Sequence, residues 1–244
     1  MLNKIYIKFL LIIISLIDIG NKIKIINFFK KKFNKKSLTI IDVGAHKGET
    51  ISLFCKNLSI DKILAFEPNS VVFKKLEKKI DKSEYKNKII LFNFGLGDKE
   101  EEKDLIINND SSSSTYNIID EKTEYYKRKK KFLSLFNKDI FRKKILTNIL
   151  PLSKVNEINY LEKIDILKID TEGYELSVLK GIYENHLKKI KYIYFEHQYN
   201  LMIKKNYKYS DIKIFLNKNN FYLAYKIKMK FRKNFEYIYE NRSQ

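Results

Sequence analysis

Residues 39–50 read Thr-Ile-Ile-Asp-Val-Gly-Ala-His-Lys-Gly-Glu-Thr. The β-branched start is typical of a buried strand, and the two glycines indicate a tight turn before a helix. We expect Gly44 and Gly48 to let the backbone approach a ligand, and the helix amino terminus to favour an electron-rich group. An ordinary strand-to-helix turn is the alternative. The candidate cofactor residues in this stretch are Asp42, Gly44, Ala45, His46 and Gly48.

A second apolar stretch, residues 63–66, ends in Glu67, about 20 residues after the glycine turn. In a doubly wound sheet, a carboxylate at this spacing accepts hydrogen bonds from the ribose hydroxyls of a bound nucleoside. We therefore predict that Glu67 binds ribose, with a solvated carboxylate at the end of a strand as the alternative. The sequence lacks the Gly-x-Gly-x-x-Gly fingerprint here, which argues against a dehydrogenase.

Strands expected at 39–43, 62–66 and 88–94 alternate with helices expected at 48–58 and 70–82. This alternation predicts a mainly parallel sheet covered on both faces by helices. The second helix begins after Asn69, a capping residue type. Its expected core positions are Val71, Val72, Leu76 and Ile80.

The segment after the third expected strand holds a further candidate residue and an expected insertion. Asp98 is a candidate for binding the adenine amino group, although a plain turn residue is an equal alternative. An extra strand is expected at 104–107, and the serines at 111–114 predict a loop that is either flexible or closes over a ligand. Residues 116–144 are rich in lysine and predict a helical insertion or lid.

Residues 164–175 contain the second informative stretch, in which a strand delivers Asp170 and Glu172 at its carboxyl end. Clustered carboxylates repel one another unless a cation, a donor or solvent lies among them, so this stretch predicts a site. The strand expected at 190–195 ends in Glu196 and His197. For His197, a catalytic role and a structural role at the sheet edge stay equally open.

Length and composition predict one domain, residues 38–244, with a helical extension at 1–37. The net charge of +20 comes mostly from lysines spread along the chain, which does not indicate a specific nucleic-acid reader. Cys55 has no partner for an intrachain disulfide, and no zinc-ligand spacing occurs. We expect a cytoplasmic protein.

The amino-terminal residues 5–17 are strongly apolar and are followed by lysines. They are fewer than the roughly 20 residues that a membrane-spanning helix needs. Two interpretations stay open, a helix packed on the domain and a peripheral anchor on the inner membrane face.

Together these stretches resemble the FkbM family of S-adenosylmethionine-dependent methyltransferases. The resemblance rests on four segments and covers about residues 38–197: 41–48, 66–69, 167–181 and 195–197. It implies a class I methyltransferase (Rossmann-like) fold, a doubly wound, mainly parallel seven-stranded sheet with one antiparallel strand. It also implies methyl transfer from S-adenosylmethionine, usually to a hydroxyl oxygen. Leu152-Ser153 departs from the family's leucine–aspartate pattern, and residues past Leu201 do not match closely.

Under this resemblance we expect O-methylation of a sugar, glycan or other small molecule, with Asp170 and His197 assisting proton removal. A divalent cation held by Asp170, Glu172 and Glu196 is an alternative way to acidify the hydroxyl. Glu172 and Glu196 otherwise face the substrate. The competing interpretations are an RNA-modifying methyltransferase, and a non-catalytic nucleotide-binding or membrane-associated protein.

Overall fold

A seven-stranded sheet forms the centre of the computed structural model, which describes residues 20–108, 114–134, 142–229 and 234–243. Its order is β3-β2-β1-β7-β8-β10-β9. Neighbouring strands from β3 to β8 are parallel, and β10 runs antiparallel to β8 and β9. This confirms the predicted fold class. The bounds are β1 Leu38–Val43, β2 Ile60–Phe66, β3 Ile89–Phe92, β7 Ile164–Ile169, β8 Ile190–Gln198, β9 Phe221–Lys228 and β10 Asn234–Asn241.

Strand β1 lies at the point where the strand order reverses, between β2 and β7. All six of its residues are buried, as expected for a β-branched run in a sheet covered on both faces. In open α/β sheets, ligands bind beyond the carboxyl ends of the strands at this switch point. The turn after β1 is fixed there because the backbone N–H groups of Gly44 and Ala45 both donate to the Phe66 carbonyl at 3.0 Å.

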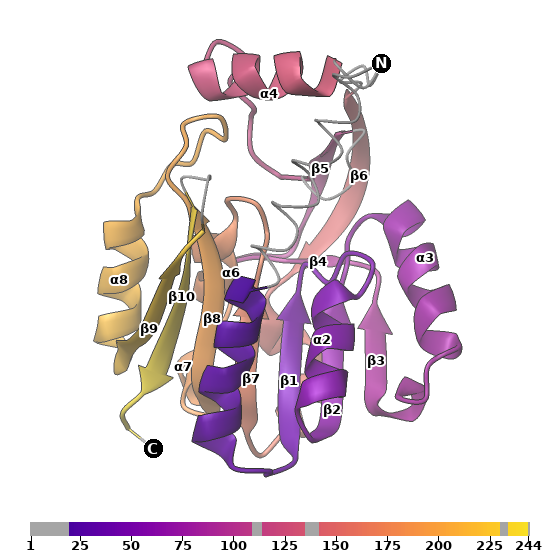
Figure 1. The fold of residues 1–244 in the computed structure, drawn as a ribbon, viewed down its shortest axis with the longest axis vertical. Helices are drawn as coiled ribbons and strands as arrows, with labels where there is room; N and C mark the ends of the chain where they lie inside the picture. The colour runs from indigo at the N-terminus through magenta and orange to yellow at the C-terminus, as the bar shows by residue number, and fades with distance from the viewer. Residues whose placement is uncertain (1–19, 109–113, 135–141, 230–233, 244) are drawn as a thin grey trace.

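Helices cover both faces of the sheet (Figure 1). One face packs against helix 20–33, α2 (Glu49–Asn57) and α3 (Ser70–Asp81). The other face packs against α5 (Asn156–Asn159), α6 (Glu175–Lys180), α7 (Glu184–Leu187) and α8 (Tyr209–Lys218).

Helix α3 begins as predicted, because the Asn69 side chain accepts hydrogen bonds from the backbone N–H groups of Val71 and Val72. The buried stripe of α3 consists of Val72, Leu76 and Ile80. Val71, which the sequence placed in the core, is exposed. It lies one position away from the i, i+4 spacing of the stripe and therefore faces solvent.

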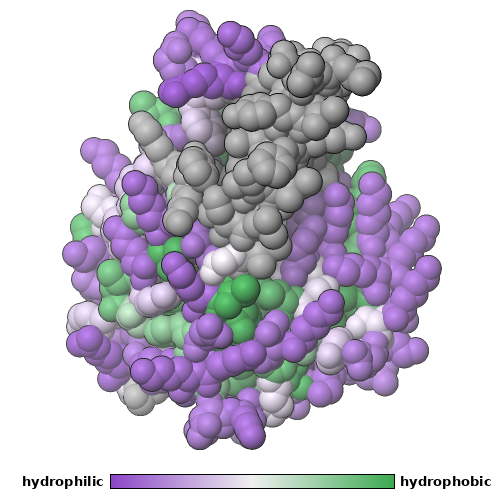
Figure 2. Space-filling view, in the orientation of Figure 1, coloured by the Kyte–Doolittle hydropathy of each residue, from purple (hydrophilic) through white to green (hydrophobic). Residues whose placement is uncertain are grey.

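Helix 20–33 is part of the hydrophobic core. Phe29 is fully buried and contacts the rings of Phe54, Tyr192 and Tyr194. The apolar residues 5–17 lie outside the described residues. Within the described ranges, no helix combines the length and apolar character required to span a bilayer. Among the coloured residues of Figure 2, hydrophilic ones cover most of the face, with hydrophobic residues grouped near its centre.

A second, smaller sheet has the order β4-β6-β5. Its strands are β4 (Gly95–Leu96), β5 (Glu101–Asn108) and β6 (Arg142–Leu150). The expected strand at 104–107 lies within β5. The expected helical segment 116–144 contains α4 (Glu124–Ser134), but its last residues already belong to β6. In the sequence of β6, the lysines and the exposed Leu146 obscure the alternation of apolar and polar residues that is typical of a strand.

Candidate active site

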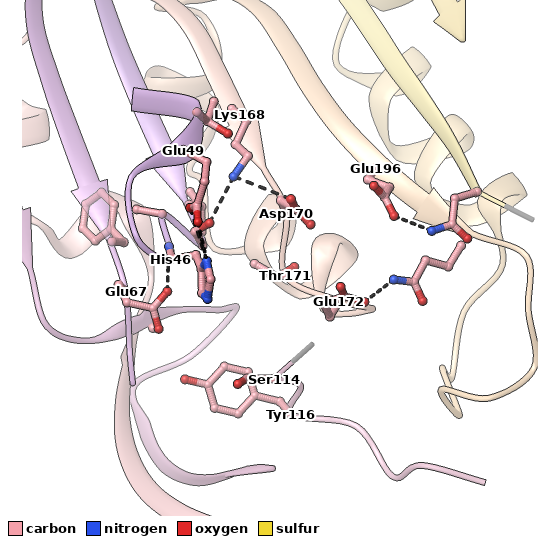
Figure 3. Close-up of a pocket in the computed structure, with 18 of the residues that line it drawn as sticks. His46, Glu49, Glu67, Ser114, Tyr116, Lys168, Asp170, Thr171, Glu172 and Glu196 are labelled. Carbon is pink, nitrogen blue, oxygen red and sulfur yellow. Dashed lines mark hydrogen bonds and ion pairs between the residues drawn. The ribbon is translucent and has the colours of Figure 1, made fainter. Parts of the chain in front are cut away.

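A cavity of about 540 Å³ opens at the carboxyl edge of the main sheet. This volume lies within the range of small-molecule and cofactor sites. From one side of the cavity to the other, Figure 3 shows labelled side chains in the order Glu67, His46, Lys168, Asp170, Glu172 and Glu196. The carboxylates that line it are Glu49, Glu67, Asp170, Glu172, Glu196 and Glu236, and the lining lysines are Lys22 and Lys168.

The glycine turn forms one wall of this cavity, through Gly44, Ala45 and His46. Gly44 has a positive φ of 77°, and a Cβ there would lie 2.0 Å from the carbonyl oxygen of Asp170. Gly48 also has a positive φ, and a Cβ there would lie 2.8 Å from Leu76 Cδ1. Both glycines are therefore required by contacts within the protein. Gly44 also lines the cavity, whereas Gly48 is not among the lining residues.

His46 and Glu49 form a polar pair at the mouth of the turn. His46 has a φ of 49°, and its Nδ1 lies 3.2 Å from Glu49 Oε1. Burial by itself would raise the pKa of Glu49, but the His46 ring and other hydrogen bonds lower it to about 2. Glu49 therefore contributes a fixed negative charge beside the turn at neutral pH.

Glu67 is buried at the end of β2, where the sequence predicted it. Its Oε2 accepts a hydrogen bond from the His46 N–H, and its Oε1 accepts one from the Asn69 N–H, both at 2.9 Å. Burial raises the pKa of Glu67, and these two hydrogen bonds oppose that rise. Each carboxylate oxygen can accept more than one hydrogen bond, so the oriented carboxylate can still accept from hydroxyl groups of a ligand.

Asp42 differs from the other candidates, because it is fully buried and is not among the residues that line the cavity. Its Oδ1 lies 2.8 Å from Lys168 Nζ. Lys168 also donates to the Gly44 carbonyl at 3.1 Å and lies 3.8 Å from Asp170 Oδ2. Burial would lower the pKa of Lys168, but the carboxylates of Asp42 and Asp170 outweigh it and raise that pKa. Asp42 therefore has a structural role: it holds Lys168 in place below the cavity and does not face the ligand space.

Asp170, Glu172 and Glu196 all line the cavity, as the sequence predicted. The backbone N–H of Asp170 donates to the Val43 carbonyl at 3.0 Å, which ties the end of β7 to β1. Burial, together with the charges of Asp170, Glu172 and Glu236, raises the pKa of Glu196 well above its usual range. Among the described residues, no group of three or more His, Cys, Asp or Glu side chains has an arrangement that could hold a metal ion.

His197 does not join Asp170, contrary to the sequence expectation that they converge on one hydroxyl. His197 is only 3% exposed and is not among the cavity residues, whereas its neighbour Glu196 is. Successive side chains of a strand point to opposite faces, so Glu196 and His197 cannot both face the cavity. The His197 ring instead contacts the rings of Tyr199 and Tyr209.

Asp98 also lies away from the cavity, which corrects its expected place beside adenine. It is exposed and accepts a hydrogen bond from the Ser177 hydroxyl at 3.1 Å. The chain leaves the main sheet at β4, before Asp98, and this departure carries the residue away from the carboxyl edge.

Sequence reasoning missed many of the cavity residues, among them the charged or polar Lys22, Lys168, Asn234 and Glu236. Lys168 did carry a signal, because a lysine within the apolar strand Ile164–Ile169 needs a buried partner. Asn234 and Glu236 reach the cavity only through the pairing of β10 with β8, which no local pattern indicates.

The sequence matches the model of the Methyltransferase FkbM domain over residues 42–223. No curated protein matches the chain. A putative RNA methyltransferase from Pyrococcus horikoshii has a TM-score of 0.50 at 9% identity, over 91% of this chain and 84% of its own. Magnesium protoporphyrin IX methyltransferase from Synechocystis PCC 6803, solved with bound SAM, has a TM-score of 0.50 at 10% identity, over 92% of this chain and 79% of its own.

The methyltransferase FkbM from Methylobacillus flagellatus KT has a TM-score of 0.49 at 15% identity, over 83% of this chain. This chain spans 44% of that protein's length. The two structures with a TM-score of 0.50 share the fold. The family match covers most of the chain, including the glycine turn and the ends of β2, β7 and β8. The chain belongs to the FkbM family of S-adenosylmethionine-dependent methyltransferases.

Proposed function

We propose that this methyltransferase acts on a hydroxyl oxygen of a small polar molecule, such as a sugar or a glycan. The observation that carries the proposal is the position of Asp170. This carboxylate lies between the Glu67 side of the cavity and the acidic side formed by Glu172 and Glu196 (Figure 3). A base in that position can serve an acceptor that enters from the acidic side.

We assign the part of the cavity beside Glu67 to the cofactor. S-adenosylmethionine supplies a methyl group on a sulfonium, which an acceptor oxygen attacks in line. We assign the ribose to Glu67, because its carboxylate is oriented by two backbone N–H groups and lines the cavity. The turn at Gly44, Ala45 and His46 borders the same space and is assigned to the rest of the nucleoside and the amino-acid part.

Asp170 is assigned as the group that accepts the hydroxyl proton. Its side chain is 44% exposed, and the cation of Lys168 lies 3.8 Å from its Oδ2. The hydrogen bond from its backbone N–H to Val43 fixes the position of its Cα. Such positioning of a base beside the acceptor, together with exclusion of water, contributes much of the acceleration in methyl transfer.

The charge of the cavity favours a small acceptor over RNA. Among the residues that the structure describes, six carboxylates and two lysines line it, and one of those lysines is paired with Asp42. A nucleic-acid backbone binds proteins chiefly through phosphate contacts with cationic groups. Within the described part of the chain, the charged groups that line the cavity are therefore mainly acidic, which disfavours a phosphate backbone there.

Labelled methyl transfer tests this proposal. The protein is incubated with methyl-labelled S-adenosylmethionine and with polysaccharide, lipid, RNA or small-molecule fractions. We expect label in the polysaccharide or small-molecule fraction, on a product that resists mild base as a methyl ether does. Saturable labelling of RNA would contradict the proposal.

Asp170→Asn is the matched test of the base, with Asp61→Asn as its control. Asp61 is an exposed residue of β2 outside the cavity. We expect Asp170→Asn to lower turnover about 100-fold or more, as loss of a general base does, with S-adenosylhomocysteine binding retained. Near-normal turnover of Asp170→Asn would show that Asp170 is not the base.

A further inference from the structure

Helix 20–33 and α2 lie side by side on one face of the main sheet (Figure 1). The ring centroids of Phe29 and Phe54 are 6.3 Å apart. Further along both helices, Lys30 Nζ donates to Asn57 Oδ1 at 3.2 Å. Because these contacts advance in the same direction along both helices, the helices run parallel to each other. The first turn of helix 20–33 therefore lies beside the start of α2, at the carboxyl edge of the sheet.

Lys22 belongs to that first turn and lines the cavity. In the next turn of the helix, Ile25 and Ile26 are buried in the core. Residues three and four apart share one face of a helix, so Lys22 stands at the end of the buried face. Helical side chains lean toward the amino terminus, which here directs the ammonium group beyond the edge of the sheet. The helix thus delivers a cation to the cavity that His46 and Glu49 also line.

The cations of the cavity are not equivalent. Among the described residues that line it, the lysines are Lys22 and Lys168, and there is no arginine. Lys168 is only 4% exposed, and its ammonium group contacts Asp42, the Gly44 carbonyl and Asp170. An ammonium group has three N–H donors, so these protein partners account for its bonding capacity. Lys22 is the lysine that is placed to meet a negatively charged group of a ligand.

S-adenosylmethionine carries one such group, the carboxylate of its amino-acid part. Glu49, with a pKa of about 2, is a fixed negative charge at the start of α2 and repels a carboxylate that lacks a cation beside it. We infer that Lys22 binds the carboxylate of the cofactor, which makes helix 20–33 a functional wall of the cofactor site. This inference rests on the placement of the ribose at Glu67 in the proposed function.

The order of the parts of the cofactor supports this assignment over a contact with the acceptor. The ribose stands between adenine and the amino-acid part, so with the ribose at Glu67 on β2 one end of the cofactor extends across the turn after β1. Phe29 contacts Phe54 of α2 and Tyr194 of β8, so its helix lies across β1 from β2. The end of the cofactor that crosses the turn therefore meets this helix, and its charged amino-acid part matches Lys22.

A comparison of two ligands tests the inference without turnover. S-adenosylhomocysteine and its decarboxylated analogue, which keeps the ammonium group and lacks only the carboxylate, are titrated calorimetrically into the parent and Lys22→Met proteins. We expect Lys22→Met to weaken binding of S-adenosylhomocysteine about tenfold or more, as loss of a hydrogen bond between charged groups does. Binding of the analogue should not weaken. Lys22→Arg, which keeps the charge, should retain most of the affinity for S-adenosylhomocysteine.

Lys24→Met is the matched control, because Lys24 is exposed on the same helix and is not among the cavity residues. It should bind both ligands as the parent does. Unchanged affinity of Lys22→Met for S-adenosylhomocysteine, or an equal loss for both ligands, would overturn the assignment of Lys22 and leave the cofactor in its place. No binding of either ligand by the parent protein would contradict the placement of the cofactor, and the inference with it.

Discussion

Lys168 Nζ lies 2.8 Å from Asp42 Oδ1, and both side chains are buried beneath the turn that follows β1. The pair joins two neighbouring strands, because Asp42 and Lys168 stand in register on β1 and β7. Lys168 also donates to the Gly44 carbonyl, so one buried cation fixes the turn and the end of β7 together. The geometry of the cavity floor therefore depends on this pair.

Replacing Lys168 by methionine should destabilise the fold strongly. The substitution leaves the Asp42 carboxylate buried without its cation, and breaking a buried pair in this way costs about 3–5 kcal/mol. Urea unfolding measures the loss. Lys62→Met, at an exposed position of β2, should change stability by less than about 0.5 kcal/mol. A Lys168→Met protein as stable as this control would show that the pair is not structural.

Gly44→Ala should be much more damaging than Gly20→Ala. A Cβ at Gly44 would lie 2.0 Å from the Asp170 carbonyl oxygen, at a positive φ, whereas a Cβ at Gly20 meets no described residue within 4 Å. We expect Gly44→Ala to lower the melting temperature by 10 °C or more, which corresponds to about 3 kcal/mol. The Gly20 variant should melt within a few degrees of the parent. Equal melting temperatures for the two variants would contradict the close packing described here.

His197 should affect stability rather than catalysis. Burial, with a smaller effect of Lys205, lowers its pKa in the folded protein from 6.5 to about 3. Between these values the unfolded chain binds a proton that the folded protein excludes, so stability falls as pH decreases from 6.5. One such proton contributes about 1.4 kcal/mol per pH unit.

The His197→Leu variant removes this titration. Its stability, measured by urea unfolding from pH 7 to pH 4.5, should depend less on pH than that of the parent. Its methyl-transfer rate at a temperature where both proteins are folded should stay within a few fold of the parent. Loss of turnover with S-adenosylhomocysteine binding intact would restore a catalytic role for His197.

Local patterns predicted the glycine turn, the parallel strands and the cap of α3, because each depends on residues close in the sequence. The sequence predicts a helical segment over the start of β6, because Leu146 is exposed and lysines precede it. The strand is defined instead by its pairing with β5, which no residue of β6 reveals alone.

In the candidate site, too, some positions follow from local sequence and others depend on strand pairing. Glu67, Asp170 and Glu196 reach one cavity because the ends of parallel strands meet at one edge of the sheet. Whether Glu196 or His197 faces that cavity depends on the orientation of β8, which the sequence does not specify when both neighbours are polar. Asn234 and Glu236 required the antiparallel return of β10 beside β8.

We also propose that residues 1–19 give the chain peripheral contact with anionic membranes. The apolar residues 5–17 followed by lysines motivate this, and helix 20–33 must be kept because Phe29 is buried in the core. Deleting residues 1–19 should abolish flotation with vesicles of phosphatidylglycerol, while the full chain floats. Identical flotation of both proteins would remove the proposal.

Calorimetric titration with S-adenosylhomocysteine tests the central claim most directly, which is that the cavity beside Glu67 holds the cofactor. The protein should bind one equivalent. Glu67→Gln should weaken binding about tenfold or more, as expected for loss of hydrogen bonds to a charged group, whereas Glu162→Gln should leave it unchanged. Unaltered affinity of the Glu67→Gln variant, or no binding by the parent protein, would contradict the account.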